Sequence, residues 1–187
     1  MREVARQHPG RRLELWFQDE ARVGQKGRTT RVWFQRGARP RRPRQVGFAS
    51  AWLSGAVCPE REAGCALALP IATTQAMSLL LAGSSAHVAA DAHAVVVLDG
   101  AGWHTARALH VPDNLALIRL PPYSPALNPV EKVWQYLRDR HLSHRVLPGL
   151  DAVIDAACAA WNRLLAEPGR LASLTRFPWL PSCVSLS

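Results

Sequence analysis

Short apolar runs separated by polar turns divide the chain into expected strands and helices. Leu13–Gln18 is rich in aromatic and aliphatic residues and predicts a strand that ends at Asp19. Val46–Val57 and Cys65–Ile71 predict two more strands, and the polar turn between them indicates a hairpin. Ala94–Leu98 is continuously apolar, as is typical of a central strand buried on both faces.

Helical patterns complete the expected order of elements. A helix from Thr73 or Thr74 to about Leu81 precedes the continuously apolar strand, and Leu115–Leu120 predicts a fifth strand. A last helix is expected over about 150–166. This order predicts one α/β domain with a mixed five-stranded sheet flanked by helices, in which an antiparallel hairpin is joined by two later parallel strands.

The helix after the last strand has a recognisable start. Asn128 is a good N-cap, Pro129 suits the first helical position, and Glu131 completes a capping box. Apolar residues at positions 130, 133, 134 and 137 keep the helical spacing. A cap alone would explain why a glutamate stands at position 131.

Three acidic residues lie where the expected elements begin or end. Asp19 and Asp99 follow strands, and Glu131 opens a helix. Such positions can meet at one edge of a sheet, where carboxylate oxygens suit Mg²⁺ and two ions can promote phosphoryl transfer. Each residue also has a purely structural interpretation: Asp19 could only end a strand, with Glu20 as its rival, and Asp99 precedes Gly100 in a common turn pair.

The formal net charge of +9 is concentrated in one segment. Residues 21–44 contain nine basic residues and no acidic one, and the other 14 of the 23 basic residues balance the 14 acidic ones. A local basic stripe favours a polyanionic partner, most simply nucleic acid, although a solvated charge run is the alternative. The candidate DNA contacts are Arg22, Lys26, Arg28, Arg31, Arg36, Arg39, Arg41, Arg42 and Arg44.

The composition narrows the class of protein. The 187 residues are 48% hydrophobic and 20% charged, which is typical of one globular domain. The arginine-rich start, up to Arg12, has no apolar stretch behind it, so no secretory signal is expected. The four cysteines form no C-x-x-C pair, so neither a zinc site nor a disulfide framework is indicated and a reducing cytoplasm is expected.

Three blocks of sequence resemble the motifs of DDE transposases in the mariner superfamily, and they are most similar to its bacterial insertion-sequence branch, the six-thirty family. The blocks are WFQDEAR at 16–22, LDGAGWH at 98–104 and LPPYSPALNPVEKVW at 120–134. The resemblance runs from about residue 13 to residue 180. Glu131 lies 32 positions after Asp99, near the spacing that such enzymes use.

The resemblance implies a fold, a site and a reaction. The fold would be RNase H-like, and Asp19, Asp99 and Glu131 would be the catalytic triad that binds two Mg²⁺ or Mn²⁺ ions. The activity would be cut-and-paste movement of a DNA element, with insertion at TA dinucleotides. His104 matches a histidine that often follows the second aspartate, and it could orient a metal ligand, touch DNA or serve the core.

The resemblance also bears on domains and partners. We expect a single RNase H-like catalytic domain over residues 1–187, with a basic clamp-like loop at 20–46 that would reach DNA across a homodimer. Only about a dozen residues precede the first expected strand, so the N-terminal helix-turn-helix domain of such transposases is expected to be absent. The alternatives are an RNase H-like nuclease that cuts without joining and a non-catalytic DNA-binding remnant.

Overall fold

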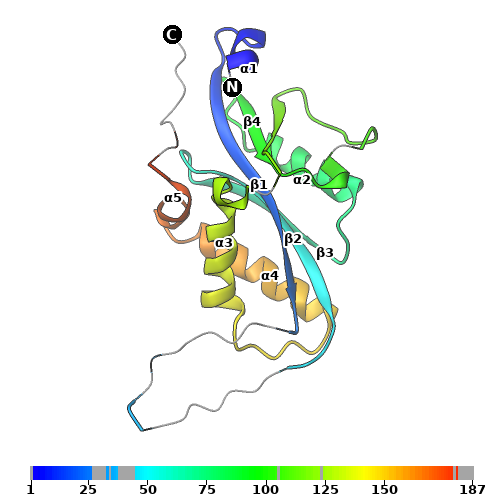
Figure 1. The fold of residues 1–187 in the computed structure, drawn as a ribbon, viewed down its shortest axis with the longest axis vertical. Helices are drawn as coiled ribbons and strands as arrows, with labels where there is room; N and C mark the ends of the chain where they lie inside the picture. The colour runs from blue at the N-terminus through cyan, green and yellow to red at the C-terminus, as the bar shows by residue number, and fades with distance from the viewer. Residues whose placement is uncertain are drawn as a thin grey trace.

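A five-stranded mixed sheet forms the centre of the molecule (Figure 1). The structure is a computed structural model that describes residues 2–26, 33, 35–37, 45–104, 106–122, 124–178 and 180. The strand order is β3-β2-β1-β4-β5. The strands are β1 (Arg12–Gly24), β2 (Ser50–Cys58), β3 (Ala63–Leu69), β4 (Ala92–Leu98) and β5 (Leu115–Arg119).

The pairing of the strands confirms the predicted topology. β1 pairs with β2, and β2 with β3, in antiparallel fashion, while β1 with β4 and β4 with β5 are parallel. β1 therefore lies between the hairpin of β2 and β3 and the two later parallel strands, β4 and β5. Two registers matter for the site: Asp19 lies opposite Gly55, and Phe17 lies opposite Val97.

Helices cover both faces of the sheet. The helices are α1 (Arg2–Gln7), α2 (Thr74–Ser85), α3 (Val130–Leu137), α4 (Leu150–Leu165) and α5 (Arg170–Thr175), with short turns η1 (Gly102–His104), η2 (Pro125–Leu127) and a π-helical segment η3 (Arg138–Leu142). Trp16 of β1 belongs to the core cluster formed with α2, whereas its neighbour Phe17 belongs to the cluster formed with α3 and α4. Successive side chains of a strand point to opposite faces, so β1 contributes to both cores.

The first strand is longer than the sequence predicts. It does not end at Asp19 but continues to Gly24, so Asp19 lies in the middle of β1. Pairing with β2 carries the strand on, and the buried residues Ala21 and Val23 continue its inward-facing pattern. The second strand begins at Ser50 rather than Val46. The sequence predicts no helix in the arginine-rich N-terminal segment, but α1 forms there.

The expected capping box at the start of α3 is wrong in detail. The helix begins at Val130, and the Asn128 side chain accepts the Val130 N–H at 3.2 Å. Among the hydrogen bonds of the described residues, none runs from Glu131 back to the Asn128 amide. Asn128 instead donates through Nδ2 to the carbonyl oxygen of Gln18 at 2.9 Å, which fastens the start of α3 to β1. Glu131 is therefore free of the capping role.

Within the described part of the chain, no helix has the length and apolar character needed to cross a bilayer.

Candidate active site

Asp19 is held on the face of the sheet that α3 and α4 cover. Its Oδ2 accepts a hydrogen bond from Nε1 of the buried Trp134 at 2.9 Å. The indole lies over Gly55 of β2, where a Cβ atom would come within 2.8 Å of the Trp134 ring. The absence of a side chain at Gly55 thus leaves room for the tryptophan that fixes Asp19.

Asp99 reaches the same place from the neighbouring strand. β1 and β4 are parallel, and Phe17 pairs with Val97. Asp19 and Asp99 each come two residues after this pair, so they occupy corresponding places along the two neighbouring strands. Asp99 stands just beyond the end of β4 with its side chain 56% exposed. Its Oδ1 accepts the Ala101 N–H at 3.0 Å, an Asp-type turn that shapes the loop after the strand.

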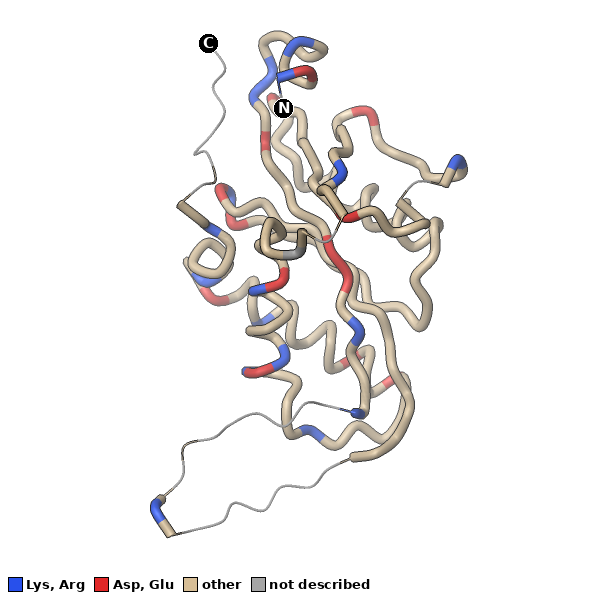
Figure 2. The backbone as a smooth tube through the Cα atoms, in the orientation of Figure 1, with Lys and Arg blue, Asp and Glu red and all other residues tan. Residues whose placement is uncertain are grey.

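Glu131 completes the group from the first turn of α3. A cavity of about 420 Å³ is lined by Asp19, Asp99 and Glu131 together with Gly100, Leu120, Pro121, Pro122, Ser124 and Asn128. Figure 2 shows acidic positions in the middle of β1 and at the start of α3, near the centre of the molecule. The structure therefore brings together the three carboxylates that the sequence singled out from separate elements.

Asp19 and Glu131 repel one another. The pKa of Asp19 is raised to about 7, first by burial and then by the nearby charge of Glu131, against the opposing hydrogen bonds from the Glu20 backbone and Trp134. Burial and the charge of Glu131 thus both disfavour the ionised form of Asp19, and a cation bound nearby would favour it. Hard carboxylate oxygens with uncompensated charge fit a divalent cation of the Mg²⁺ type.

Glu20, the rival of Asp19, points to the opposite face. Its side chain is 6% exposed, and its Oε1 accepts hydrogen bonds from Nε2 of Gln18 at 2.8 Å and Nε1 of Trp103 at 3.2 Å. The His104 Nε2 lies 3.1 Å from the same oxygen. Glu20 does not line the cavity that contains Asp19.

His104 connects that face to Asp99. Its Nδ1 lies 2.9 Å from Asp99 Oδ1, while Nε2 faces Glu20, and the ligand atoms of the three residues lie within 4.8 Å of one another. Burial tends to lower the pKa of His104, but the hydrogen bond and charge of Glu20, followed by Asp99, raise it overall. Burial likewise tends to raise the pKa of Glu20, and its hydrogen bond with His104 outweighs this and lowers it.

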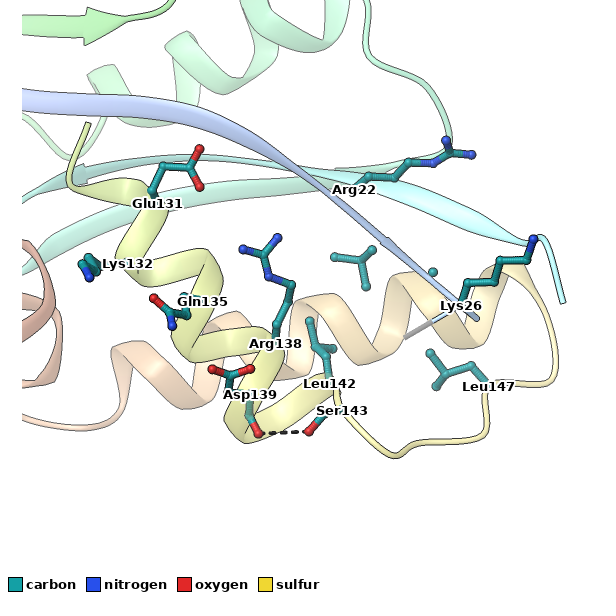
Figure 3. Close-up of a pocket in the computed structure, with 12 residues that line it drawn as sticks. Arg22, Lys26, Glu131, Lys132, Gln135, Arg138, Asp139, Leu142, Ser143 and Leu147 are labelled. Atoms are coloured by element: carbon teal, nitrogen blue, oxygen red, sulfur yellow. Dashed lines mark hydrogen bonds between the residues drawn. The ribbon is translucent and has the colours of Figure 1, made fainter. Parts of the chain in front are cut away.

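A second hollow lies beside Glu131, along α3 and the end of β1 (Figure 3). It measures about 560 Å³ and contains the predicted DNA contacts Arg22 and Lys26, together with Arg138. Figure 3 shows the Arg138 side chain between Glu131 and Lys26, whereas Arg22 points away, consistent with its hydrogen bonds to Ser50 Oγ. Arg138 was not predicted, although it lies about two helical turns after Glu131 and so on the same helix face.

Of the other predicted DNA contacts, the structure describes Arg36, which is exposed and lines neither of the two cavities. Six positions lie outside the described residues: Arg28, Arg31, Arg39, Arg41, Arg42 and Arg44.

Comparisons with known proteins agree on the family. The model of the DDE superfamily endonuclease family matches residues 14–154. The uncharacterised protein y4pE/y4sA of Sinorhizobium fredii (strain NBRC 101917 / NGR234) is 46% identical over 129 residues, which cover 69% of this chain and 96% of that protein.

Solved structures show the same fold at low sequence identity. The Mos1 strand transfer complex matches with a TM-score of 0.52 at 15% identity, covering 88% of this chain and 55% of that one. The Mos1 mariner paired end complex with Mn matches with a TM-score of 0.53 at 15% identity, covering 88% and 56%. The chain thus spans somewhat more than half the length of these structures.

An intasome from simian T-cell lymphotropic virus, in complex with the PP2A regulatory subunit B56 gamma, has the same fold. Its TM-score is 0.51 at 14% identity, over 90% of this chain and 56% of that one. The mixed five-stranded sheet and its flanking helices are therefore an RNase H-like fold, as the resemblance implied. With the family match over most of its length, this chain belongs to the DDE superfamily of endonucleases, metal-dependent enzymes that cleave DNA by phosphoryl transfer.

Proposed function

We propose that this chain is the catalytic domain of a cut-and-paste DNA transposase, with Asp19, Asp99 and Glu131 as its catalytic carboxylates. The observation that carries the proposal is the single cavity lined by all three residues, which arrive from β1, from the loop after β4 and from α3. Two divalent cations, Mg²⁺ or Mn²⁺, bound there would activate the attacking oxygen and stabilise the leaving oxygen.

The residues around the cavity have defined tasks in this proposal. Trp134 fixes Asp19 through one carboxylate oxygen, and the Ala101 N–H does the same for Asp99. Asn128 fastens the start of α3 to β1 and thereby aims Glu131 at the two aspartates. Asp19 and Asp99 are each oriented by a hydrogen bond, and Glu131 by the placement of its helix, which suits a metal site with a fixed geometry.

The proposal includes DNA as substrate and partner. We take the basic segment 21–44 to meet DNA phosphates in the manner of a clamp. Its residues up to Gly24 belong to β1 rather than to the expected loop, and Arg22 and Lys26 line the hollow beside Glu131. The similar Mos1 structures are a strand transfer complex and paired-end complexes, which supports element ends and target DNA as the substrates here. A homodimer and insertion at TA dinucleotides belong to the same proposal.

The domain assignment is also part of the proposal. Residues 1–187 form one RNase H-like catalytic domain. The chain spans 55% of the Mos1 strand transfer structure, which leaves room in that protein for further parts.

The test compares the parent with Glu131→Gln in a DNA cleavage and strand-transfer assay. The substrates are an uncleaved element end, a pre-cleaved end and a TA-containing target, with Mn²⁺ present. Glu131→Gln should keep its fold and its DNA binding but lose cleavage and joining, because an amide is a much poorer ligand for a hard cation than a carboxylate. Asp139→Asn, on the neighbouring η3 segment, is the matched control and should stay active.

The outcomes separate the alternatives. Near-parental activity in Glu131→Gln would remove Glu131 from the catalytic group. Cleavage without joining by the parent would identify a nuclease of the same fold. DNA binding without cleavage by the parent, at any divalent cation concentration, would identify a non-catalytic DNA-binding remnant.

A further inference from the structure

A buried carboxylate lies directly behind the proposed catalytic group without belonging to it. Glu20 follows Asp19 in β1 but faces the α2 side of the sheet, since successive side chains alternate. One of its oxygens, Oε1, is approached by three nitrogen atoms, those of Gln18, Trp103 and His104. Burying an ionised carboxylate is costly unless hydrogen bonds compensate it, so this arrangement needs a reason.

The contacts continue from Glu20 to Asp99. The His104 ring, whose side chain has 0% exposure, lies between them, with Nε2 at 3.1 Å from Glu20 Oε1 and Nδ1 at 2.9 Å from Asp99 Oδ1. Trp103, which precedes it in η1, is also bonded to Glu20. Glu20 therefore fastens two consecutive residues of the loop after β4 to the central strand.

The loop that carries Asp99 is also held through η1. His104 Nδ1 lies 3.1 Å from the backbone carbonyl oxygen of Asp99, and the His104 N–H donates to the carbonyl oxygen of Ala101 at 3.0 Å. A Cβ atom added at Gly100 would meet nothing within 4 Å, so close packing does not fix that position. The Asp99 side chain is 56% exposed. Its Oδ1 is engaged by His104 and the Ala101 N–H, whereas no hydrogen bond between described residues involves its Oδ2. One oxygen is thus fixed to the protein and the other is available to a cation in the cavity.

We infer that Glu20 is a positioning residue, which holds His104 against Asp99 and so presents the second carboxylate to the divalent cation. The inference rests on the proposed function, since it takes Asp99 to be a cation ligand. Glu20 acts through His104, in the manner of the outer residues that orient ligands in metal sites. The competing role is direct ligation, because Glu20, Asp99 and His104 form a group that is itself compact enough for a metal ion.

The two roles differ in what glutamine can replace. A glutamine at position 20 offers an amide oxygen to the same three donors, so it preserves the hydrogen bonds to the loop. Alanine removes them. As a ligand of a hard cation, glutamine would be nearly as poor as alanine.

The experiment measures Mn²⁺ affinity from the electron paramagnetic resonance signal of free Mn²⁺, without DNA. The proteins are the parent, Glu20→Ala, Glu20→Gln, Asp99→Asn and the control Asp139→Asn, with each fold checked by circular dichroism. Glu20→Ala should weaken Mn²⁺ binding by about 10-fold, within the 10–100-fold range for such outer residues, while Glu20→Gln stays near the parent.

A second variant protects the test against misfolding of Glu20→Ala. His104→Gln should weaken Mn²⁺ binding to a similar degree. The double variant Glu20→Ala/His104→Gln should bind as His104→Gln does, because the glutamate acts only through the histidine.

The outcomes are distinct. Equal loss in Glu20→Ala, Glu20→Gln and Asp99→Asn would make Glu20 a ligand and overturn the inference. Parental affinity in folded Glu20→Ala or in His104→Gln, with Asp99→Asn impaired, would overturn the inference alone. Equal binding by the parent and Asp99→Asn would overturn the proposed function, and the inference with it.

Discussion

At the scale of single residues, the Asp19 carboxylate is expected to lower the free energy of unfolding of the metal-free protein. Its pKa rises from 3.8 to about 7 in the folded state, first through burial and then through Glu131. A folded-state pKa above the unfolded one means that the native protein binds more protons between these values. Stability therefore falls as the pH rises from about 4 to about 7, and the loss is complete above that window.

Removing this charge should stabilise the metal-free protein. Asp19→Asn is expected to raise the melting temperature in EDTA at pH 8, by a gain on the order of 1 kcal/mol, or about 2–4 °C for a domain of this size. At pH 4 the gain should disappear, because the native aspartate is then protonated. Thermal denaturation at both pH values measures it, with exposed Asp139→Asn as the control. A gain that is equal at both pH values would contradict a charge effect.

Metal binding should reverse the same repulsion. A ligand that binds only the native state adds stability by mass action, about 2.7 kcal/mol at a concentration 100 times its dissociation constant. Millimolar Mn²⁺ should therefore raise the melting temperature of the parent but not that of Asp99→Asn, and EDTA should abolish the rise. If both proteins rise alike, Asp99 is not part of the cation site.

At the scale of elements, β2 takes part in the site although it contributes no carboxylate. Its Gly55 lies opposite Asp19, under the rings of Trp134 and Trp161. A Cβ atom there would come within 2.8 Å of Trp134 and 3.1 Å of Trp161, both of which are buried. The position of α3 and the orientation of Asp19 thus depend on a missing side chain in the neighbouring strand.

Gly55→Ala should disturb both stability and the site. Overpacking a filled core costs about 1–3 kcal/mol, and here the displaced group is the donor that holds Asp19. We expect a lower melting temperature and weaker Mn²⁺ binding in the same variant. Gly149→Ala, where an added Cβ meets nothing within 4 Å, is the matched control. A Gly55→Ala protein that keeps parental stability and Mn²⁺ affinity would show that Trp134 is not constrained by this contact.

At the scale of the whole molecule, charge of opposite sign is separated along the chain. The carboxylates meet at one cavity near the middle of the sheet, whereas the excess of basic residues lies in segment 21–44 of the sequence. A cation site next to a basic surface suits a substrate that is a polyanion. Binding by the basic segment and chemistry at the carboxylates should therefore be separable by mutation.

Salt dependence tests the basic segment. Each phosphate contact contributes about 0.9 to the slope of log affinity against log salt. Replacing Arg39, Arg41, Arg42 and Arg44 with alanine should flatten that slope and weaken binding to all duplex sequences alike. A control with four other arginines replaced, Arg2, Arg6, Arg107 and Arg163, removes the same charge from the rest of the chain. Equal effects of the two variants would mean that only net charge matters.

The sequence by itself determined the order of the five strands, the class of the sheet and the three candidate carboxylates, but not helices α1 and α5. These depend on local signals: apolar periodicity, turn residues, and acidic residues placed within recognisable motifs. The continuously apolar Ala94–Leu98 was identified as a central strand because burial on both faces leaves no polar position in it, and the structure places it between β1 and β5.

Tertiary structure alone decided where β1 ends and which face each acid occupies. The strand continues past Asp19 because β2 pairs with it, and that partner is about 30 residues away in sequence. The same pairing sends Asp19 towards α3 and Glu20 towards η1, which adjacent letters in a sequence do not distinguish. The contacts of Gly55 with Trp134, and of Glu20 with His104, join segments far apart in the chain. Local patterns carry no information about such contacts, because they form only when the sheet assembles.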